Sequence, residues 1–391
     1  MQVADKPTFA AVEMPVAPVR SRLDWVDNLR TLMILLVVNM HACVTYTWVG
    51  SWYYNSPPEP SLGVKIPFLF WQGHLQAFFM GLLFFIAGYY ADRSLAKRGA
   101  KAFLIERMRR LGIPVLIYML AIHPLIVIGL HPGYPSAGIA SYLPFITSGR
   151  FLSSSGPMWF AFALLIFSAV FAFVSPYLPK VSRKPLRVTG WGVLGLGVFI
   201  ALFSFLIRTV QPLGTSILNF QLCYFAQYLV VFPLGIWVSR RDVLAQIAGS
   251  EVAKWAGILG LVLGPVALLG VLAVSLPLPA AHPYPFEGGW NPISLAMCLW
   301  EQVAGVAIGL GAMALCVRKL NVKTAFSAWL SDRSFAVYML HAPVLVGISL
   351  LLQPYRSTAF VMVPIVTVLA LAAGFLVADG AKRIPGLRSV L

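Results

Sequence analysis

The stretch FLFWQGHLQAFFMGLLFFIAGYYA, residues 68–91, decides the class of fold. It contains no Asp, Glu, Lys or Arg, and a helix of this length can cross the ~30 Å hydrocarbon core of a bilayer. Basic residues return at Arg93 and continue to Lys101. A long apolar run that ends in cations is typical of a transmembrane helix followed by a membrane-flanking loop.

The composition extends this interpretation to the whole chain of 391 residues. Hydrophobic residues make up 59% and charged residues 11%, whereas a soluble domain carries roughly 25% charged residues. This excludes a water-soluble, disordered or disulfide-scaffolded protein, and no C-x-x-C indicates a zinc or redox site. We predict an all-α polytopic transmembrane helix bundle. The ten predicted spans are 31–49, 68–91, 112–130, 157–178, 189–208, 219–238, 255–275, 293–317, 334–353 and 359–379.

The basic residues indicate how these spans are oriented. If every span crosses the membrane, 25 of the 29 Lys and Arg residues lie on one side of it. The other side has only four: Lys65, Arg150, Arg208 and Arg356. The positive-inside rule then predicts that both termini are cytoplasmic. The net charge of +16 is therefore a sign of topology, and we expect no nucleic-acid partner.

The sequence predicts one membrane domain preceded by a short tail. Residues 1–21 lack the apolar core of a signal peptide, so we expect a disordered cytoplasmic tail. Residues 22–391 are expected to form a single ten-helix membrane domain. Its longest outer connections, 50–67, 131–156 and 276–292, are rich in Pro, Gly, Tyr and Trp and are expected to form an outer binding mouth.

Ionisable residues inside spans are costly and therefore indicate candidate sites. His41 lies eleven residues after Arg30, which places it on the same helix face and ~16 Å deeper. His341 reaches a similar depth eight residues after Arg333, with Tyr338 on its face. A neutral imidazole at this depth is a competent general base. The alternative is a structural histidine that hydrogen bonds a neighbouring helix.

Two other groups of charged residues have alternative interpretations. Glu301 lies inside the outer edge of its span. There it either binds an acceptor or takes a proton from a second base, or it pairs with Arg208. Arg107 and Arg110 belong to the basic segment 93–110, which suits phosphate groups because guanidinium binds them bidentately. Lipid headgroups attract such segments equally well.

Four segments resemble one family of membrane enzymes. RLDWVDNLRTLMILLVVNMHA (22–42), FFMGLLFFIAGYYADRSLAKRGAKAFLIERMRRLGIPVL (78–116), GPMWFAFALLIFS (156–168) and FAVYMLHAPVLV (335–346) occur in the order typical of the acyltransferase-3 family. The family's hallmark is a basic residue, ten residues and a His, matched by Arg30 and His41. Gly81 and Ala87 depart from it, because Pro and Ser are usual there.

The resemblance implies an acyltransferase of the inner (cytoplasmic) membrane, with the lipid bilayer as its environment. It implies transfer of an acyl group from cytoplasmic acyl-CoA, such as acetyl-CoA or succinyl-CoA, to a hydroxyl of an envelope carbohydrate or glycolipid. No metal is expected. Three residues are expected to act in catalysis: His41, His341 and Glu301. Four are expected to hold the CoA donor: Arg30, Arg107, Arg110 and Tyr338.

Two alternatives stay open at this point. A transporter or flippase of an envelope precursor also places polar residues at the membrane midplane. No inverted repeat is visible in the sequence. A non-catalytic membrane scaffold is the other alternative, and the intramembrane histidines argue against it.

Overall fold

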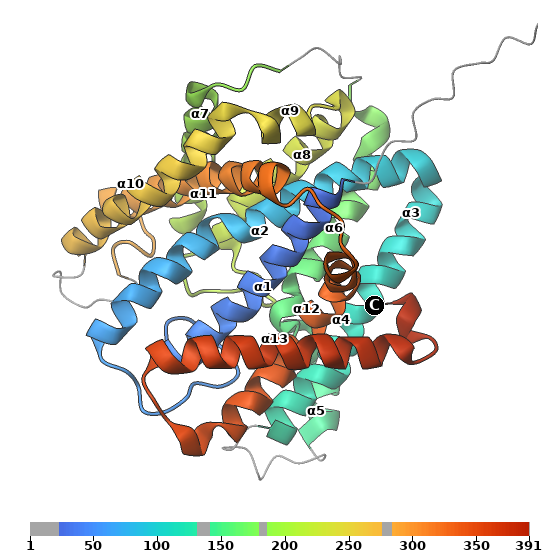
Figure 1. Ribbon diagram of the computed structural model, residues 1–391, viewed down its shortest axis with the longest axis vertical. Helices are drawn as coiled ribbons and strands as arrows, with labels where there is room; N and C mark the ends of the chain where they lie inside the picture. The colour runs from blue at the N-terminus through green and yellow to red at the C-terminus, as the bar shows by residue number, and fades with distance from the viewer. Residues whose placement is uncertain (1–22, 131–140, 180–185, 276–283, 391) are drawn as a thin grey trace, which may run out of the picture.

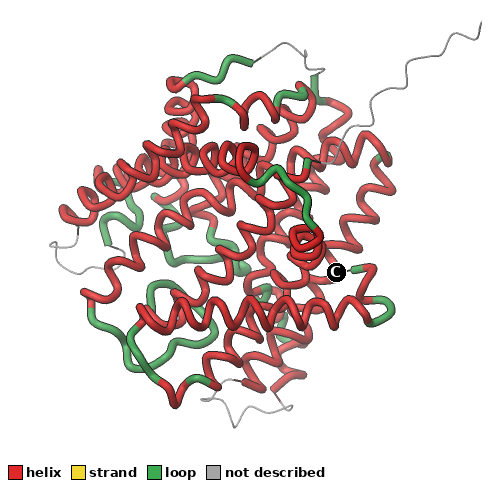
Figure 2. The backbone as a smooth tube through the Cα atoms, viewed as in Figure 1, coloured by secondary structure: helices red, strands yellow, loops and turns green. Residues whose placement is uncertain are grey.

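The described part of the computed structural model comprises residues 23–130, 141–179, 186–275 and 284–390, and it is built of helices and loops (Figures 1 and 2). Ten helical segments within it are long and apolar enough to cross a membrane, which confirms the predicted helix bundle. The predicted tail, residues 1–21, lies outside the described residues. The ten segments are α1 (Asp24–Thr47), α2 (Leu62–Arg98), Ala100–Leu130, Gly156–Tyr177 with α6 (Trp159–Val174) at its centre, α7 (Gly190–Arg208), Leu222–Arg241 with α8 (Phe225–Arg241), α10 (Glu251–Ser275), α11 (Pro292–Lys319), α12 (Ala325–Leu351) and α13 (Ala359–Arg383).

Helix α2 is the axis around which the bundle packs. It lies against α8 and α11, while α1 packs against α12 and α13 (Figure 1). Small residues bring these backbones close together: Gly88 of α2 lies against the carbonyl of Phe232, and Gly235 of α8 lies against the carbonyl of Phe85. Close approach at glycine is the usual way in which membrane helices gain packing, because apolar side chains gain little by leaving lipid for protein.

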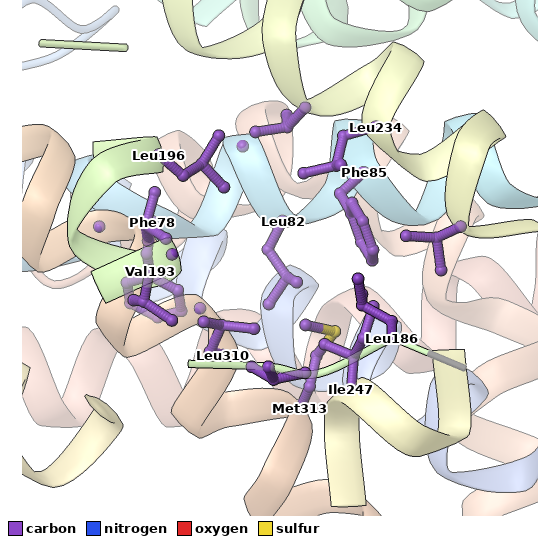
Figure 3. A pocket seen from close by; sticks show the side chains of 18 of the residues that line it. Phe78, Leu82, Phe85, Leu186, Val193, Leu196, Leu234, Ile247, Leu310 and Met313 are labelled. Carbon is purple, nitrogen blue, oxygen red and sulfur yellow. The ribbon is translucent and has the colours of Figure 1, made fainter. Parts of the chain in front are cut away.

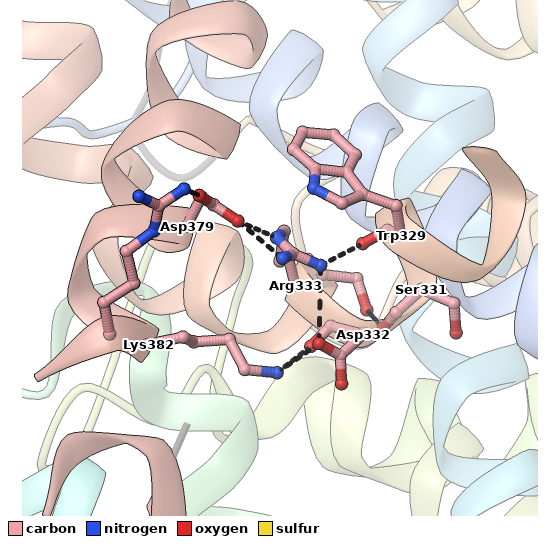
Figure 4. Close-up of polar contacts among 8 residues, drawn as sticks. Trp329, Ser331, Asp332, Arg333, Asp379 and Lys382 are labelled. Carbon is pink, nitrogen blue, oxygen red and sulfur yellow. Dashed lines mark hydrogen bonds and ion pairs between the residues drawn. The ribbon is translucent and has the colours of Figure 1, made fainter. Parts of the chain in front are cut away.

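One end of the bundle collects cations, and we call it the basic end. Helices α2, α8, α11 and α13 each finish on two basic residues, where positive charge is favourable at a helix C-terminus. Ion pairs tie neighbouring helices together there. Arg333 of α12 binds Asp379 of α13 and lies over the ring of Trp329, and Lys382 binds Asp332 (Figure 4).

The segment expected to be a basic loop, 93–110, is helical instead. Helix α2 continues to Arg98, and after Gly99 the chain enters α3 (Ala100–Arg107). Gly99 has φ +75°, which glycine adopts without a Cβ penalty, so one residue is enough to redirect the chain. The helix continues through its charged residues, which lie beyond the lipid core. A prediction of spans from apolar residues alone therefore ends the helix too early.

The third span is irregular along most of its length. After α3 it alternates α4 (Ile113–Ile117) with π-helical turns at 108–112, 118–122 and 125–130. Pro114 and Pro124 each remove a backbone donor, and a widened turn relieves the clash that proline causes in a regular helix. π-Helical turns occur often at functional sites. Here the irregular span presents Tyr118 and His123 to the interior of the bundle.

The connections at the opposite end fold back into the bundle. After α1, Trp48 adopts a left-handed conformation with φ 61°, and its indole donates to the carbonyl of Ser56 at 2.9 Å. The amide of Ser56 in turn donates to the carbonyl of Thr45 at 2.8 Å. These two bonds press residues 49–56 onto the end of α1, directly above His41.

Candidate functional site

Two histidines from distant parts of the chain meet inside the bundle. His341 of α12 is fully buried, and its Nε2 lies 3.0 Å from Nδ1 of His41 on α1. Its other nitrogen, Nδ1, lies 2.6 Å from the carbonyl oxygen of Tyr338. The matched depth noted in the sequence therefore corresponds to direct contact.

The hydrogen-bond partners assign the tautomer of both rings. A carbonyl oxygen only accepts, so Nδ1 of His341 carries the hydrogen. In a neutral ring Nε2 of His341 then accepts, and Nδ1 of His41 donates to it. His41 is consequently held in the tautomer whose Nε2 carries a lone pair, which is the form that a general base requires.

An aromatic residue from the loop after α1 packs against the His41 ring. Trp52 stacks on the imidazole, with ring centroids 3.9 Å apart and planes at 18°. The His341 ring centroid lies 5.0 Å from that of His41 and 5.9 Å from that of Trp52, so His341 meets the edge of the His41 ring while Trp52 covers one face. These two contacts restrict rotation of His41. The sequence indicated only an aromatic-rich outer connection and did not single out Trp52.

His41 lines a cavity of about 660 Å³ inside the bundle. Its walls combine aromatic rings, among them Trp52 and Trp159, with side-chain amides such as Gln72 and Asn219. Two buried polar atoms in this wall have no hydrogen-bond partner among the described residues: Oε1 of Gln72 and Nε1 of Trp52. One accepts and the other donates, so a hydroxyl group can satisfy either atom.

A second hydrogen-bonded group lines the same cavity. The hydroxyl of Tyr53 lies 3.0 Å from that of Tyr118 and 2.9 Å from Nδ1 of His123. Burial raises the pKa of Tyr53, which keeps its phenol protonated at neutral pH. Gly156, with φ +47°, fits beneath this group because a Cβ there would collide with the hydroxyl of Tyr53 and with the ring and hydroxyl of Tyr118. The sequence did not single out His123 as a catalytic or binding residue.

The arginines expected to hold a donor gather at the basic end. Arg107 is half-buried, its guanidinium lies over the ring of Phe103 at 5.0 Å, and Arg30, Arg98 and Arg110 all act on it electrostatically. These four arginines form the arginine cluster. Arg98 and Arg110 share the carboxylate of Glu106. Clustered guanidinium groups repel one another, and a polyanion relieves this repulsion.

The comparison with known families identifies the chain. A family model described as an acyltransferase domain matches residues 23–379, nearly the whole sequence. The chain belongs to the acyltransferase-3 family. No curated protein and no solved structure matches it. The protein is thus a membrane acyltransferase, as the four sequence segments implied.

The structure of this acyltransferase places Glu301 away from the histidine pair. Its carboxylate binds Arg208 of α7, and both side chains are buried. The ring of Tyr224 faces the same guanidinium at 5.6 Å. Of the two interpretations weighed for Glu301, the observed contact is the pairing with Arg208, which joins α11 to α7.

Tyr338 lies beside the histidine pair and not in the arginine cluster. Its hydroxyl donates to the carbonyl of Pro157, and its ring stacks on His341 at 6.1 Å. In the acyltransferase it therefore links α12 to the Gly-Pro segment at the wall of the cavity. Among the described residues, no group of three or more His, Cys, Asp and Glu side chains could hold a metal ion.

The departure from the family pattern at Gly81 has a packing reason. A Cβ at this position would collide with the amide of Gln227 on α8. That amide donates to the carbonyl of Ala77 at 2.8 Å and to Oε1 of Gln302 at 3.0 Å. In this acyltransferase, glycine therefore makes room for a buried polar contact among α2, α8 and α11.

Proposed function

We propose that this acyltransferase moves an acyl group from acyl-CoA to a hydroxyl of an envelope carbohydrate or a related acceptor. Acetyl-CoA and succinyl-CoA are the donors we favour. The proposal rests above all on the contact between His41 and His341 at the wall of the 660 Å³ cavity. A histidine held in its basic tautomer next to a space for substrate is suited to deprotonating a hydroxyl.

The proposed reaction uses His41 as a proton carrier. Nε2 of His41 takes the proton of the acceptor hydroxyl while the oxygen attacks the thioester carbonyl. The tetrahedral intermediate expels the CoA thiolate, and the proton on His41 passes to that sulfur. Nε2 of His341 accepts from Nδ1 of His41 throughout, which stabilises the imidazolium as it forms. The products are an ester and free CoA thiol.

The arginine cluster is the proposed donor site. Its guanidinium groups match the phosphates of CoA in charge and in bidentate geometry. Arg30 begins the helix face that leads to His41, about 16 Å further along α1. The arm that connects the CoA phosphates to the thioester spans this interval, so the thioester reaches the histidine pair from the basic end. Glu301, the third residue considered for catalysis, has no step in this scheme.

The walls of the cavity favour a carbohydrate as acceptor. Sugars present apolar faces that stack on aromatic rings and hydroxyl groups that bond to amides. The cavity offers Trp52 and Trp159 for stacking, and Gln72, Gln76 and Asn219 for hydroxyl groups. We place the basic end in the cytoplasm, where acyl-CoA is made, and the cavity toward the outer face of the inner membrane.

Labelled acyl-CoA tests the function directly. The purified protein in vesicles receives acetyl-CoA with a radiolabelled acetyl group and extracted envelope glycans. We expect label in an alkali-labile ester on the glycan and stoichiometric release of CoA thiol. A flippase would move the glycan across the vesicle membrane without releasing thiol, and that outcome would reject the proposal. Mass spectrometry of envelope glycans from cells with and without the gene identifies the acyl increment.

A further inference from the structure

A second cavity, of about 250 Å³, lies on the other face of α2. Apolar side chains from α2, α7, α8 and α11 converge on it, as Figure 3 shows for Phe78, Leu82, Leu196, Leu234 and Leu310. Their neighbours on α2, Phe79 and Met80, face the cavity of the histidine pair instead. Helix α2 therefore separates the two cavities.

Gly309 of α11 reveals how open this second cavity is. The residue is buried, yet a Cβ built on it would meet no atom within 4 Å. Gly305, one turn earlier, behaves differently, because a Cβ there would strike the backbone carbonyl of Ala77. Close packing thus holds at Gly305 and ends at Gly309, where the helix surface faces unfilled space.

Few polar side chains line the interior of this cavity. Nε2 of Gln227 donates to Ala77 and Gln302, and nearly all the rest of the wall is aliphatic or aromatic. A sugar or nucleotide would lose its hydrogen bonds with water there and gain none. The wall therefore selects an apolar ligand.

The rim of the cavity lies at the basic end of the bundle. The extended residues 186–189 line the cavity, and Gln246 of α9 (Leu244–Gly249) clamps this segment with both of its amide atoms. Its Oε1 accepts from the amide of Leu186 at 3.3 Å, and its Nε2 donates to the carbonyl of Leu186 at 2.5 Å. Arg187 on this rim is exposed, and Trp191 nearby is 83% exposed. Exposed cations and tryptophans in one short segment are typical of the level at which lipid headgroups lie.

We infer that this cavity binds one acyl chain of a membrane glycerophospholipid, with the lipid phosphate beside Arg187. Three features together point to this ligand: an apolar wall, an opening at headgroup level and a cation at that opening. The helix that forms one wall of the cavity, α7, also exposes Leu194, Phe199 and Leu202 on its outer surface, where lipid would contact it. The inference does not depend on the proposed catalytic function.

Photolabelling tests this site without any measurement of activity. The full chain is reconstituted in vesicles of phosphatidylethanolamine and phosphatidylglycerol that contain a phospholipid with a diazirine in its acyl chain. After illumination, mass spectrometry locates the label. We expect labelled Leu196, Leu310 and Met313 in excess over Leu261 and Val266, which face outward on α10. Equal labelling of the two groups would overturn the inference.

Gly309→Phe provides the matched variant, because the ring fills the cavity without moving backbone. Labelling of the cavity wall should fall about tenfold, since chain and ring compete for one space, while labelling of α10 stays unchanged. Gly347→Phe on α12 is the control: a Cβ there also meets nothing, and this position does not line the cavity. Gly309→Leu serves if the larger side chain prevents folding. Unchanged wall labelling in a folded variant would contradict the inference.

Two further arms identify the ligand. Arg187→Ala should weaken labelling of the wall by the phospholipid probe and leave labelling by a diazirine fatty alcohol, which has no phosphate, unaltered. Loss of the label upon addition of excess acyl-CoA would show that the cavity holds the chain of the acyl donor, and the inference would then be wrong.

Discussion

Nε2 of His341 lies 3.0 Å from Nδ1 of His41, although 300 residues separate the two in the chain. The carbonyl of Tyr338 fixes the hydrogen of His341 on Nδ1, and this in turn leaves His41 with a basic Nε2. One backbone carbonyl thus sets the protonation pattern of the whole pair. The arrangement predicts different roles for two chemically identical side chains.

His41→Ala should lower kcat by about 10²–10⁴-fold, because the variant lacks the general base. Binding of acyl-CoA, measured by calorimetry, should be nearly unchanged, since the arginine cluster lies toward the basic end. His74→Ala is a matched control: His74 is also a buried histidine, bonded to the carbonyl of Phe70 and absent from the cavity wall. Normal turnover by the His41 variant with its true acceptor would reject the mechanism.

His341→Ala should reduce kcat by less, about 10–100-fold, as expected for a partner that orients a functional histidine. The double variant His41→Ala/His341→Ala should be no slower than His41→Ala alone, because His341 acts through His41. Steady-state kinetics of the four proteins test this. Additive losses would mean that each histidine contributes independently and that the assigned roles are wrong.

Arg107→Ala/Arg110→Ala should raise the KM for acyl-CoA at least about tenfold, since each charge-assisted bond contributes ~1.5–3 kcal/mol. Lysine at both positions should restore binding only in part, because the bidentate geometry is lost. Arg383→Ala, at the same end but paired with Asp379, is the control. If KM does not change in the double variant, the two arginines serve topology alone.

Trp52→Phe should raise the KM for the acceptor by about two- to tenfold, the net value of one neutral hydrogen bond. The phenyl ring still stacks on His41 but has no indole N–H for the substrate. The KM for acyl-CoA should stay constant, which separates acceptor binding from donor binding. Trp290→Phe changes an exposed tryptophan outside the cavity and should alter neither constant.

Labelling of single cysteines from outside intact cells tests the orientation. Cysteine at Ser51 or Glu59 should react with a membrane-impermeant maleimide, and cysteine at Lys101 or Lys323 should not. The four native cysteines are buried, so the background is low. Reaction at Lys101 from outside would reverse the orientation and remove the arginine cluster from the cytoplasm.

The sequence by itself determined the helices of this protein. A span needs only a sufficient run of apolar residues, which is a local property, so ten spans are predictable from runs such as 68–91. The predicted ends are less accurate, and α2 continues through the basic residues to Arg98. Four segments together, among them the one with Arg30 and His41, also indicated the family, because the residue spacing within each segment is a local property of the sequence.

Only the tertiary structure decided which residues meet. Sequence reasoning found His41 and His341 but not their contact. It also missed Trp52 and Gln72 in the cavity wall, because both contact or belong to a loop that folds back over α1. Glu301 had two open partners until packing brought Arg208 against it. Contacts between spans depend on the rotation and tilt of each helix, and these follow from close approach at glycines such as Gly88 and Gly235. The hydrophobic effect inserts every span into lipid, but it differs little between one arrangement of the spans and another.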